Sequence, residues 1–157
     1  MKVSELKKMA EHENTYWWHK GKTYLIKTLV DKHFPIKKNL QILEIGCGTG
    51  GLTKNLVEYG NVTAFDISSD AVEYCKNAGL KNVFVMDIKD FDPKDYKRKF
   101  DLVLALDVLE HIQDDIDAMK KIKQVLKKDG LFFVNVPAHK FLWSEHDEAL
   151  ENKRRYH

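Results

Sequence analysis

The sequence predicts an α/β fold, built as a doubly wound, mostly parallel sheet. Three observations lead to this prediction. Short apolar runs alternate with amphipathic stretches along most of the chain, which is the pattern of successive strand–helix units. The run Phe100–Leu106 is nearly all apolar, as expected for a strand covered on both faces. A glycine-rich turn, Gly46–Gly51, follows the first run, at the place where such sheets bind ligands.

Each predicted element follows from its own residues. The five predicted strands are, in chain order, Leu40–Ile45, Asn61–Ile67, Asn82–Met86, Phe100–Leu106 and Leu131–Val136. The predicted helices between them are Leu52–Tyr59, Asp70–Asn77 with Ser68 or Ser69 as its N-cap, and Asp115–Lys128, whose apolar residues recur every three to four positions. We expect Gly79 to end the second helix, Asp129-Gly130 the third, and Pro137 the last strand.

The first 39 residues differ from the rest because no strand is predicted in them. Val3–Glu13 and Lys22–His33 have helical patterns, and the aromatic cluster Tyr16-Trp17-Trp18 lies between them. Both segments precede the first strand. Residues 1–39 are therefore expected to form an N-terminal helical cap, and residues 40–157 the ligand-binding α/β core of a single domain.

Composition excludes several classes of protein. The 157 residues favour one domain with a sizeable core. With 26 basic and 24 acidic residues the net charge is +2, which predicts no nucleic-acid partner. No run approaches about 18 apolar residues, so no membrane span is predicted. Cys47 and Cys75 form no CxxC pair, and the first residues lack a signal-peptide pattern, so a reduced, cytoplasmic protein is expected.

The glycine-rich turn predicts a ligand site. Glycine adopts positive φ and has no Cβ, so a ligand can touch the backbone there. The residues predicted to line it are Gly46, Cys47, Gly48 and Gly50. Because Gly46, Gly48 and Gly51 also satisfy the GxGxxG pattern of dinucleotide loops, the turn alone leaves the ligand open.

Acidic residues near the strand ends narrow the choice. Asp66 lies 20 residues after Gly46, next to Ile67, and can accept both hydroxyls of an adenosine ribose. This fits NAD and S-adenosylmethionine (SAM) equally, but disfavours NADP because its 2′-phosphate would be repelled. Asp87 can accept from an adenine amino group, while its neighbours Met86 and Ile88 offer apolar faces to the ring.

Glu44, two residues before the first glycine, is expected beside the glycine loop and the ammonium end of the ligand. SAM carries an ammonium and a sulfonium but no phosphate. A site with several acidic side chains therefore suits SAM better than a pyrophosphate.

Together these motifs resemble class I SAM-dependent methyltransferases. Glu44–Gly50 is similar to the glycine-rich motif of that family, Asp66 to its ribose-binding acid and Asp87 to its adenine-site acid. Phe100–His111 resembles the strand-four motif that runs under the methionine moiety. The resemblance implies a Rossmann-like methyltransferase core, SAM as cofactor, S-adenosylhomocysteine (SAH) as product, and transfer of a methyl group by in-line displacement.

A narrower resemblance involves segments outside the core motifs. The chain resembles a bacterial and archaeal subgroup whose members are often associated with sugar, lipid or cell-envelope biosynthesis. The segments that carry this resemblance are Tyr16-Trp17-Trp18, Leu142–Asp147 and Lys153–Tyr156. The resemblance implies a small-molecule, sugar or lipid acceptor. Where that subgroup commonly has a Gly-His pair, this chain has Glu151-Asn152.

Several further residues have two interpretations each. Leu106 is expected to line the methionine site through its carbonyl. Asp107 and His111 face the methionine end or the acceptor, or else Asp107 caps a short helix and His111 is exposed. Trp17, with Trp18, covers the sulfonium as a lid through cation–π contact, or packs within the cap.

The C-terminal residues also have two interpretations. His146 in a loop is the candidate general base for a hydroxyl acceptor, or a surface histidine. Lys153-Arg154-Arg155 binds an anionic acceptor or forms a solvated tail. The histidines show no metal-ligand spacing, so no metal site is predicted.

Three hypotheses of different class follow. The first is an active methyltransferase. The second is a SAM-binding or partner-binding module without turnover, and the third an NAD-dependent oxidoreductase. The family's sheet has seven strands and only five are predicted here, so we expect either a truncated product or replacement of the last two strands, with a homodimer covering strand Leu131–Val136 as one option. The identity of the acceptor is not predicted.

Overall fold

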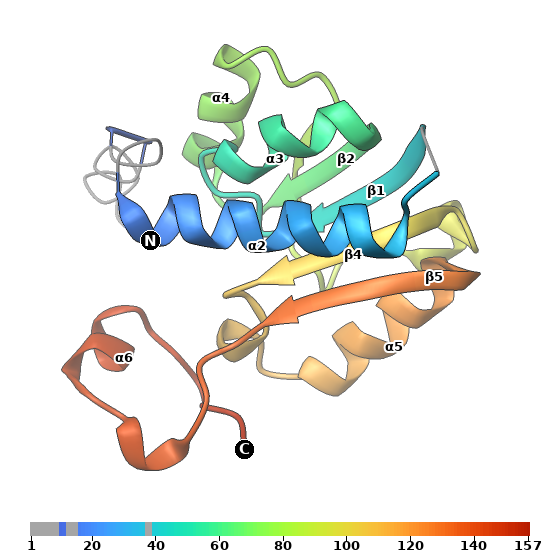
Figure 1. Cartoon of the computed structure of the whole chain (residues 1–157). Coiled ribbons are helices and arrows are strands. Elements are labelled where there is room, and N and C mark those ends of the chain that lie inside the picture. Colours follow the sequence, from blue (N-terminus) through green and yellow to red (C-terminus); the bar gives the residue numbers. More distant parts are fainter. Residues whose placement is uncertain (1–9, 12–15, 37–38) are drawn as a thin grey trace.

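The computed structural model describes residues 10–11, 16–36 and 39–157. They form a five-stranded parallel sheet of order β3-β2-β1-β4-β5, flanked by helices (Figure 1). The strands are β1 Leu40–Ile45, β2 Gly60–Asp66, β3 Val83–Val85, β4 Phe100–Leu106 and β5 Leu126–Asn135. The helices are α2 Trp17–His33, α3 Gly51–Leu56, α4 Ser69–Asn77, α5 Asp115–Val125 and α6 Glu145–Ala149, with short 3-10 turns η1 Val57–Tyr59, η2 Pro93–Tyr96, η3 Leu109–His111 and η4 Lys140–Leu142. The predicted α/β class is confirmed.

The alternation of side chains along β1 and β4 divides the core into two layers. On one face Ile42, Leu102 and Leu104 pack with Val30 of α2 and Leu56 of α3. The other face carries a second cluster with α5, formed by Leu43, Ile45, Val103, Ala105, Ala118 and Ile122 among others. Since β1 and β4 are buried on both faces, they are almost continuously apolar, as the sequence predicted.

The order of the strands creates a switch point between β1 and β4. From β1 the chain moves outward through β2 to β3, and then returns to place β4 on the other side of β1. Connections that leave neighbouring parallel strands in opposite directions open a crevice at their carboxyl ends. The loops that follow β1 and β4 therefore meet at the place where this fold class binds ligands.

Several predicted boundaries were wrong. The aromatic residues Trp17 and Trp18 do not precede a helix but form the first turn of α2. The predicted helix Asp115–Lys128 ends at Val125. Gly130 does not stop it, because it lies inside β5, where an added Cβ would stand 3.0 Å from the carbonyl oxygen of Phe100. A bulge in the β4–β5 pairing explains this close approach.

The N-terminal cap is described only in part. Most of the predicted helix Val3–Glu13 lies outside the described residues. Helix α2 packs on the sheet through Ile26 and Val30, and Phe34 extends this contact. The division of the chain at residue 39 stays a prediction. Within the ranges that the structure describes, no helix has the length and apolar character needed to cross a membrane.

Candidate functional site

The glycine loop after β1 has a conformation that needs its glycines. Gly46, Gly48 and Gly50 have φ of 72°, 53° and 87°. A Cβ on Gly46 would lie 2.4 Å from Cγ2 of Val108, so the loops after β1 and β4 touch at this residue. The backbone N–H groups of Gly46 and Cys47 both donate to the Phe65 carbonyl, which ties the loop to β2. The loop is thus a preformed backbone cradle at the switch point.

Asp66 at the end of β2 braces this loop. Its Oδ2 accepts from the backbone N–H of Gly48 at 2.9 Å, and its Oδ1 accepts from the backbone N–H of Ser68 at 2.9 Å. A carboxylate has about four acceptor positions. Two positions therefore remain for the ribose hydroxyls that the sequence assigns to it. The neighbouring Ile67 is 70% exposed.

Glu44 lies beneath the loop and is 5% exposed. The hydroxyl of Thr53 on α3 donates to its Oε2 at 2.6 Å. The sequence predicted the glycine loop and the ligand as the neighbours of Glu44, but did not predict this contact with α3. Since Thr53 lies in the helix that follows the glycine loop, Glu44 also fixes that helix relative to β1.

Cys47 in the loop lies against Cys75 of α4. Both thiols are free, and their Sγ atoms are 3.8 Å apart. The thiol of Cys75 also donates to the carbonyl of Gly48 at 3.3 Å. The hydrogen bond with Cys75 and burial, together with the charges of Glu44 and Asp66, raise the pKa of Cys47 far above its usual range. Cys47 is therefore a neutral packing residue in the floor of the loop.

The end of β3 supplies the predicted adenine-side residues. The backbone N–H of Met86 donates to the carbonyl of Asp66, which aligns the two strand ends. Burial opposes ionisation of Asp87, but hydrogen bonds from the backbone and the ammonium of Lys89 outweigh it and lower the pKa of Asp87. Ile88 is 6% exposed and packs in the core. Asp87 is thus an ionised acid near the ribose-side carboxylate.

The end of β4 carries a polar network that sequence reasoning identified only in part. After Leu106, Asp107 has φ 57°, and its backbone N–H donates to the carbonyl of Asn135. Its Oδ2 accepts from Nζ of Lys22 on α2 at 2.7 Å, and its Oδ1 from the amide of Asn135 on β5. Asp107 therefore joins α2 to β5. The prediction missed Lys22 and Asn135 because only the fold brings them together.

Glu110 is the third residue that the prediction did not single out. It is 3% exposed, and its Oε2 has no hydrogen-bond partner among the described residues. Burial raises the pKa of Glu110 to about 7, and the nearby charge of Asp107 adds to this, while its own backbone N–H and the charge of Lys22 oppose it. The sequence signal that could have identified Glu110 was its position inside the motif Phe100–His111. An acid at the site whose protonation changes near neutrality is a candidate functional group.

His111 follows in the same turn and is exposed. Desolvation lowers the pKa of His111, although a hydrogen bond with the backbone of Glu151 and the charge of Asp107 oppose this. Glu151 belongs to the C-terminal segment. His111 therefore lies where the loop after β4 meets the last residues of the chain.

The C-terminal segment, residues 137–157, is closed on itself. Ala138 pairs with Tyr156, and Arg155 donates to both carboxylate oxygens of Asp147 at 2.8 Å. Asp147 is 1% exposed. The hydrogen bonds from Arg155 lower the pKa of Asp147 against the effect of burial. Arg154 and Arg155 form ion pairs with Asp115 and Asp147, so the predicted solvated tail is wrong. Binding of an anionic acceptor by the run Lys153–Arg155 stays a prediction.

His146 and Trp17 lie in helices rather than in the loops that follow the strands. His146 lies not in a loop, as predicted, but in α6, where it is exposed. Figure 1 shows α6 set apart from the strand ends. Trp17 heads α2 and is 69% exposed, with its ring edge against Trp18. Because Lys22 ties the same helix to Asp107, the first turn of α2 is held on the side of the site.

Comparison with known proteins adds independent findings. A family model described as a methyltransferase domain matches residues 17–156. The curated protein named ubiquinone biosynthesis O-methyltransferase from Pelagibacter ubique is 34% identical over 119 residues, which cover 69% of this chain and 49% of that protein. The chain thus spans about half the length of this curated relative.

Solved structures agree on the fold. Coclaurine N-methyltransferase bound to N-methylheliamine and SAH superposes with a TM-score of 0.61 at 27% identity, covering 74% of this chain and 37% of that one. The cyclase SpnF superposes with a TM-score of 0.66 at 20% identity, covering 81% of this chain and 50% of that one. At the latter identity the likeness shows the fold alone.

Proposed function

The chain belongs to the methyltransferase domain family, and from this premise we propose that it binds SAM and transfers its methyl group to a small-molecule, sugar or lipid acceptor. The predicted membership of a methyltransferase family is therefore correct. The observation that carries the proposal is the glycine cradle with Asp66 bound to its backbone and four further acids around the strand ends. Those acids are Glu44, Asp87, Asp107 and Glu110.

The residues present fit the cofactor. A Cβ on Gly46 would collide with Val108, so this glycine lets the loops after β1 and β4 approach closely. In the turn after β4, Oε2 of Glu110 has no partner among the described residues and offers an acceptor. The strand-end acids outnumber their cationic partners Lys22 and Lys89, which favours a ligand with positive charge. When bound, SAM supplies a methyl group activated by its sulfonium, and the in-line displacement leaves neutral SAH.

The chain's own residues bind, orient and exclude water in this proposal. Asp66 would hold the ribose and Asp87 the adenine amino group, while Met86 and Ile88 would offer apolar faces to the adenine ring. Glu44 and the carbonyl of Leu106 support the methionine end, with Asp107 and His111 beside it. Alignment of the nucleophile with the methyl group accounts for most of the required barrier reduction.

Two groups are proposed for the acceptor side. Trp17 would cover the sulfonium as part of a lid. Two observations support this role: Trp17 is exposed, and the ion pair between Lys22 and Asp107 holds its helix beside the site. His146, whose side chain is exposed on α6, would serve as general base for a hydroxyl acceptor. In this role its imidazole would accept the proton of the acceptor hydroxyl.

A thermal-shift comparison tests the cofactor. SAH is expected to raise the unfolding temperature of the whole chain by an amount that grows with the logarithm of its concentration, while NADH leaves it unchanged. Stabilisation by NADH alone would overturn the SAM proposal and favour the oxidoreductase that the GxGxxG pattern of Gly46, Gly48 and Gly51 also permits.

Turnover needs a separate experiment, since a SAM-binding module without methyl transfer is the second candidate. The fold shared with the cyclase SpnF is compatible with this alternative, because a fold does not determine a reaction. SAM labelled in its methyl group should transfer the label to an extracted pool of sugars, lipids or other small molecules. Tight binding of SAH with no labelled product from any pool would select the module.

The edge of β5 carries no sixth strand within the described residues, and we propose that a second copy of the chain covers it. Val134 on that strand is 47% exposed. A cytoplasmic location is supported by Cys47 and Cys75, whose free thiols suit a reducing compartment. Fractionation of the source cells checks the location.

A further inference from the structure

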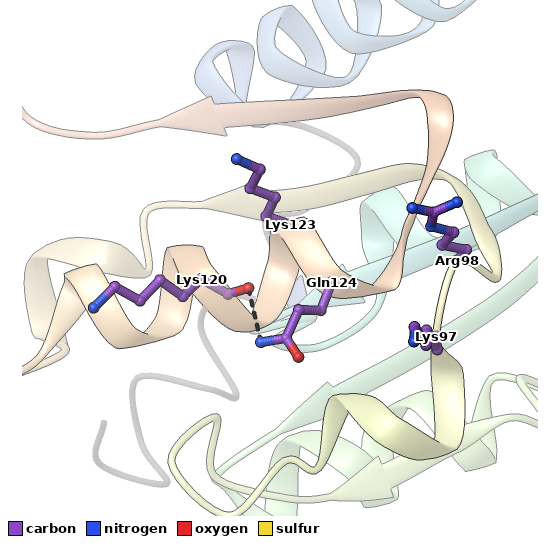
Figure 2. Close-up of a pocket in the computed structure, with 5 residues that line it drawn as sticks. All are labelled: Lys97, Arg98, Lys120, Lys123 and Gln124. Atoms are coloured by element: carbon purple, nitrogen blue, oxygen red, sulfur yellow. Dashed lines mark hydrogen bonds between the residues drawn. The ribbon is translucent and has the colours of Figure 1, made fainter.

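A pocket of about 460 Å³ lies near the start of β4, at the opposite end of the strands from the glycine loop. Lys97 and Arg98 line it from the turn between η2 and β4, and Lys120, Lys123 and Gln124 from the second half of α5 (Figure 2). This turn precedes β4, whereas the candidate methyl-transfer site follows it. The seven residues of β4 separate the two by about 20 Å, at roughly 3.3 Å per residue. An occupant of the pocket cannot touch the cofactor loop.

The pocket concentrates positive charge without a counter-charge. Four of the five lining side chains are cationic and none is acidic, and no carboxylate in the described part of the chain forms an ion pair with any of the four. Neighbouring lysines behave differently, since Lys121 pairs with Asp117 and Lys127 with Asp101. In a chain whose net charge is only +2, this is a local accumulation. A concave surface lined by one sign of charge attracts ions of the opposite sign.

Backbone contacts hold the two sides of the pocket together. Arg98 has φ 50°, in the left-handed region that a non-glycine residue rarely adopts. Its backbone N–H donates to the carbonyl of Gln124 at 3.1 Å, in the last turn of α5. The side-chain amide of Gln124 donates in turn to the carbonyl of Lys120, as Figure 2 shows. The turn is thus docked on the helix, and the cationic side chains project from a fixed frame.

The chemistry of the lining selects the kind of ligand. Ammonium and guanidinium groups only donate, and together they suit a group with several negatively charged oxygen atoms. None of the five lining residues is aromatic, so the pocket lacks the stacking surface with which single-stranded nucleic acids are bound. Its volume lies in the range of small-molecule sites, of the order of 300–1,000 Å³.

We propose that this pocket binds a phosphate-bearing ligand with two or more negative charges, at a site separate from the methyl-transfer site. A soluble diphosphate and the phosphate headgroup of a lipid share this chemistry. The proposal does not depend on the methyltransferase function, because no residue of the cofactor site lines the pocket.

Isothermal titration of the whole chain with inorganic pyrophosphate tests the proposal. Saturable binding to one site per chain is expected. Replacing the three lysines together, Lys97→Gln, Lys120→Gln and Lys123→Gln, should weaken it by about tenfold or more. Arginine at the same three positions keeps the charge and should keep binding. If the glutamine variant does not fold, the arginine variant still tests the proposal. An SAH-induced shift in unfolding temperature equal to that of the wild type shows that a variant is folded.

A matched control removes the same charge elsewhere. Lys76, Lys81 and Lys128 are exposed and do not line the pocket. Their joint replacement by glutamine should change pyrophosphate affinity by less than about twofold. An equal loss in both triple variants would mean general charge attraction and overturn the proposal.

A vesicle experiment distinguishes the two sources of phosphate. Binding of the chain to vesicles containing phosphatidic acid is compared with its binding to vesicles of phosphatidylcholine alone. If the chain binds only the first kind, and the binding requires Lys97, Lys120 and Lys123, the ligand is a lipid headgroup. Absence of saturable binding to both pyrophosphate and these vesicles would overturn the proposal. So would tighter binding of a single-stranded RNA oligomer that the three glutamines abolish, since the partner would then be a nucleic acid.

Discussion

Asp66 has two tasks that a sequence pattern cannot separate. One carboxylate oxygen binds the backbone of the glycine loop and the other binds the start of the segment before α4. The ribose role proposed for it uses the remaining acceptor positions. Its removal therefore affects both the shape of the cradle and the ligand contact.

We expect Asp66→Ala to weaken SAH binding by about 1.5–3 kcal/mol, the scale of hydrogen bonds to a charged group. Isothermal titration with SAH measures this. Glu73→Ala removes an exposed acid from α4 and is the matched control, with affinity unchanged. Equal affinity of the Asp66 variant and the wild type would refute the ribose role.

Glu110 makes the stability of the fold depend on pH. Burial raises its pKa to about 7 from an ordinary value of 4.5, so the folded chain holds this proton over a range in which the unfolded chain has lost it. The stabilisation is complete below pH 4.5 and is lost as the pH rises towards 7. Above that value the folded chain carries a buried charge with one unpartnered oxygen.

Glu110→Gln removes this titration, and its stability relative to the wild type should rise between pH 4.5 and 7 and then level off. The gain has an upper limit of about 3 kcal/mol, since each pKa unit is worth about 1.4 kcal/mol. Urea unfolding at several pH values measures it. The exposed Glu148→Gln is the control, and parallel pH profiles for all three proteins would contradict the prediction.

At the scale of elements, the segment after β5 is the least expected part of the molecule. Its two ends meet through the pairing of Ala138 with Tyr156, and Tyr156 donates to Asp115 at the start of α5. Glu151 has φ 59° within it, in the left-handed region that glycine adopts without strain. The left-handed conformation at Glu151 therefore explains why the subgroup that this chain resembles commonly has glycine at this position.

Glu151→Gly should therefore stabilise the chain by about 0.5–1 kcal/mol, because the strain of a left-handed side-chain-bearing residue exceeds the entropy cost of glycine. Glu148→Gly, inside α6, should destabilise it by a similar amount. Thermal unfolding of both variants checks the opposite signs. A loss of stability in both would show that the position of Glu151 is not strained.

The accuracy of the sequence predictions followed the range of the interactions. The bounds of β1 and β4 were correct because a strand buried on both faces shows its limits in the apolar run itself. The N-cap of α4 was correct, as Ser68 accepts from the backbone N–H of Ala71. The end of α5 was wrong because Gly130 serves a bulge against β4, a contact between residues distant in sequence.

The candidate site also divides into residues placed by local order and residues placed by packing. The loop glycines and the strand-end acids could be predicted, since their positions follow from the order of strands and turns. Lys22, Asn135 and the contact between Cys47 and Cys75 could not, because each joins two elements whose packing the sequence does not state.

At the scale of the whole molecule, charge is distributed unevenly between the two ends of the sheet. Acids gather where β1, β2, β3 and β4 end, and unpaired cations gather where β4 begins and α5 ends. The net charge of +2 conceals this polarity. The uneven distribution of charge favours the proposed cationic ligand at the first end and the proposed anionic ligand at the second.

Among the described residues, β5 is an edge strand of the sheet. An edge strand presents unpaired backbone groups, and natural proteins often protect such edges with lysine. The proposed second copy would pair along this edge, so the chain should elute from a sizing column as a dimer whose fraction rises with concentration. Val134→Lys places a charge on the edge, at an exposed position of β5, and should shift the chain to monomer without changing SAH binding. Ile116→Lys makes a similar change on exposed α5 and should leave the dimer intact. A monomer at all concentrations in the wild type, or an equal shift in both variants, would mean that β5 is not where copies meet.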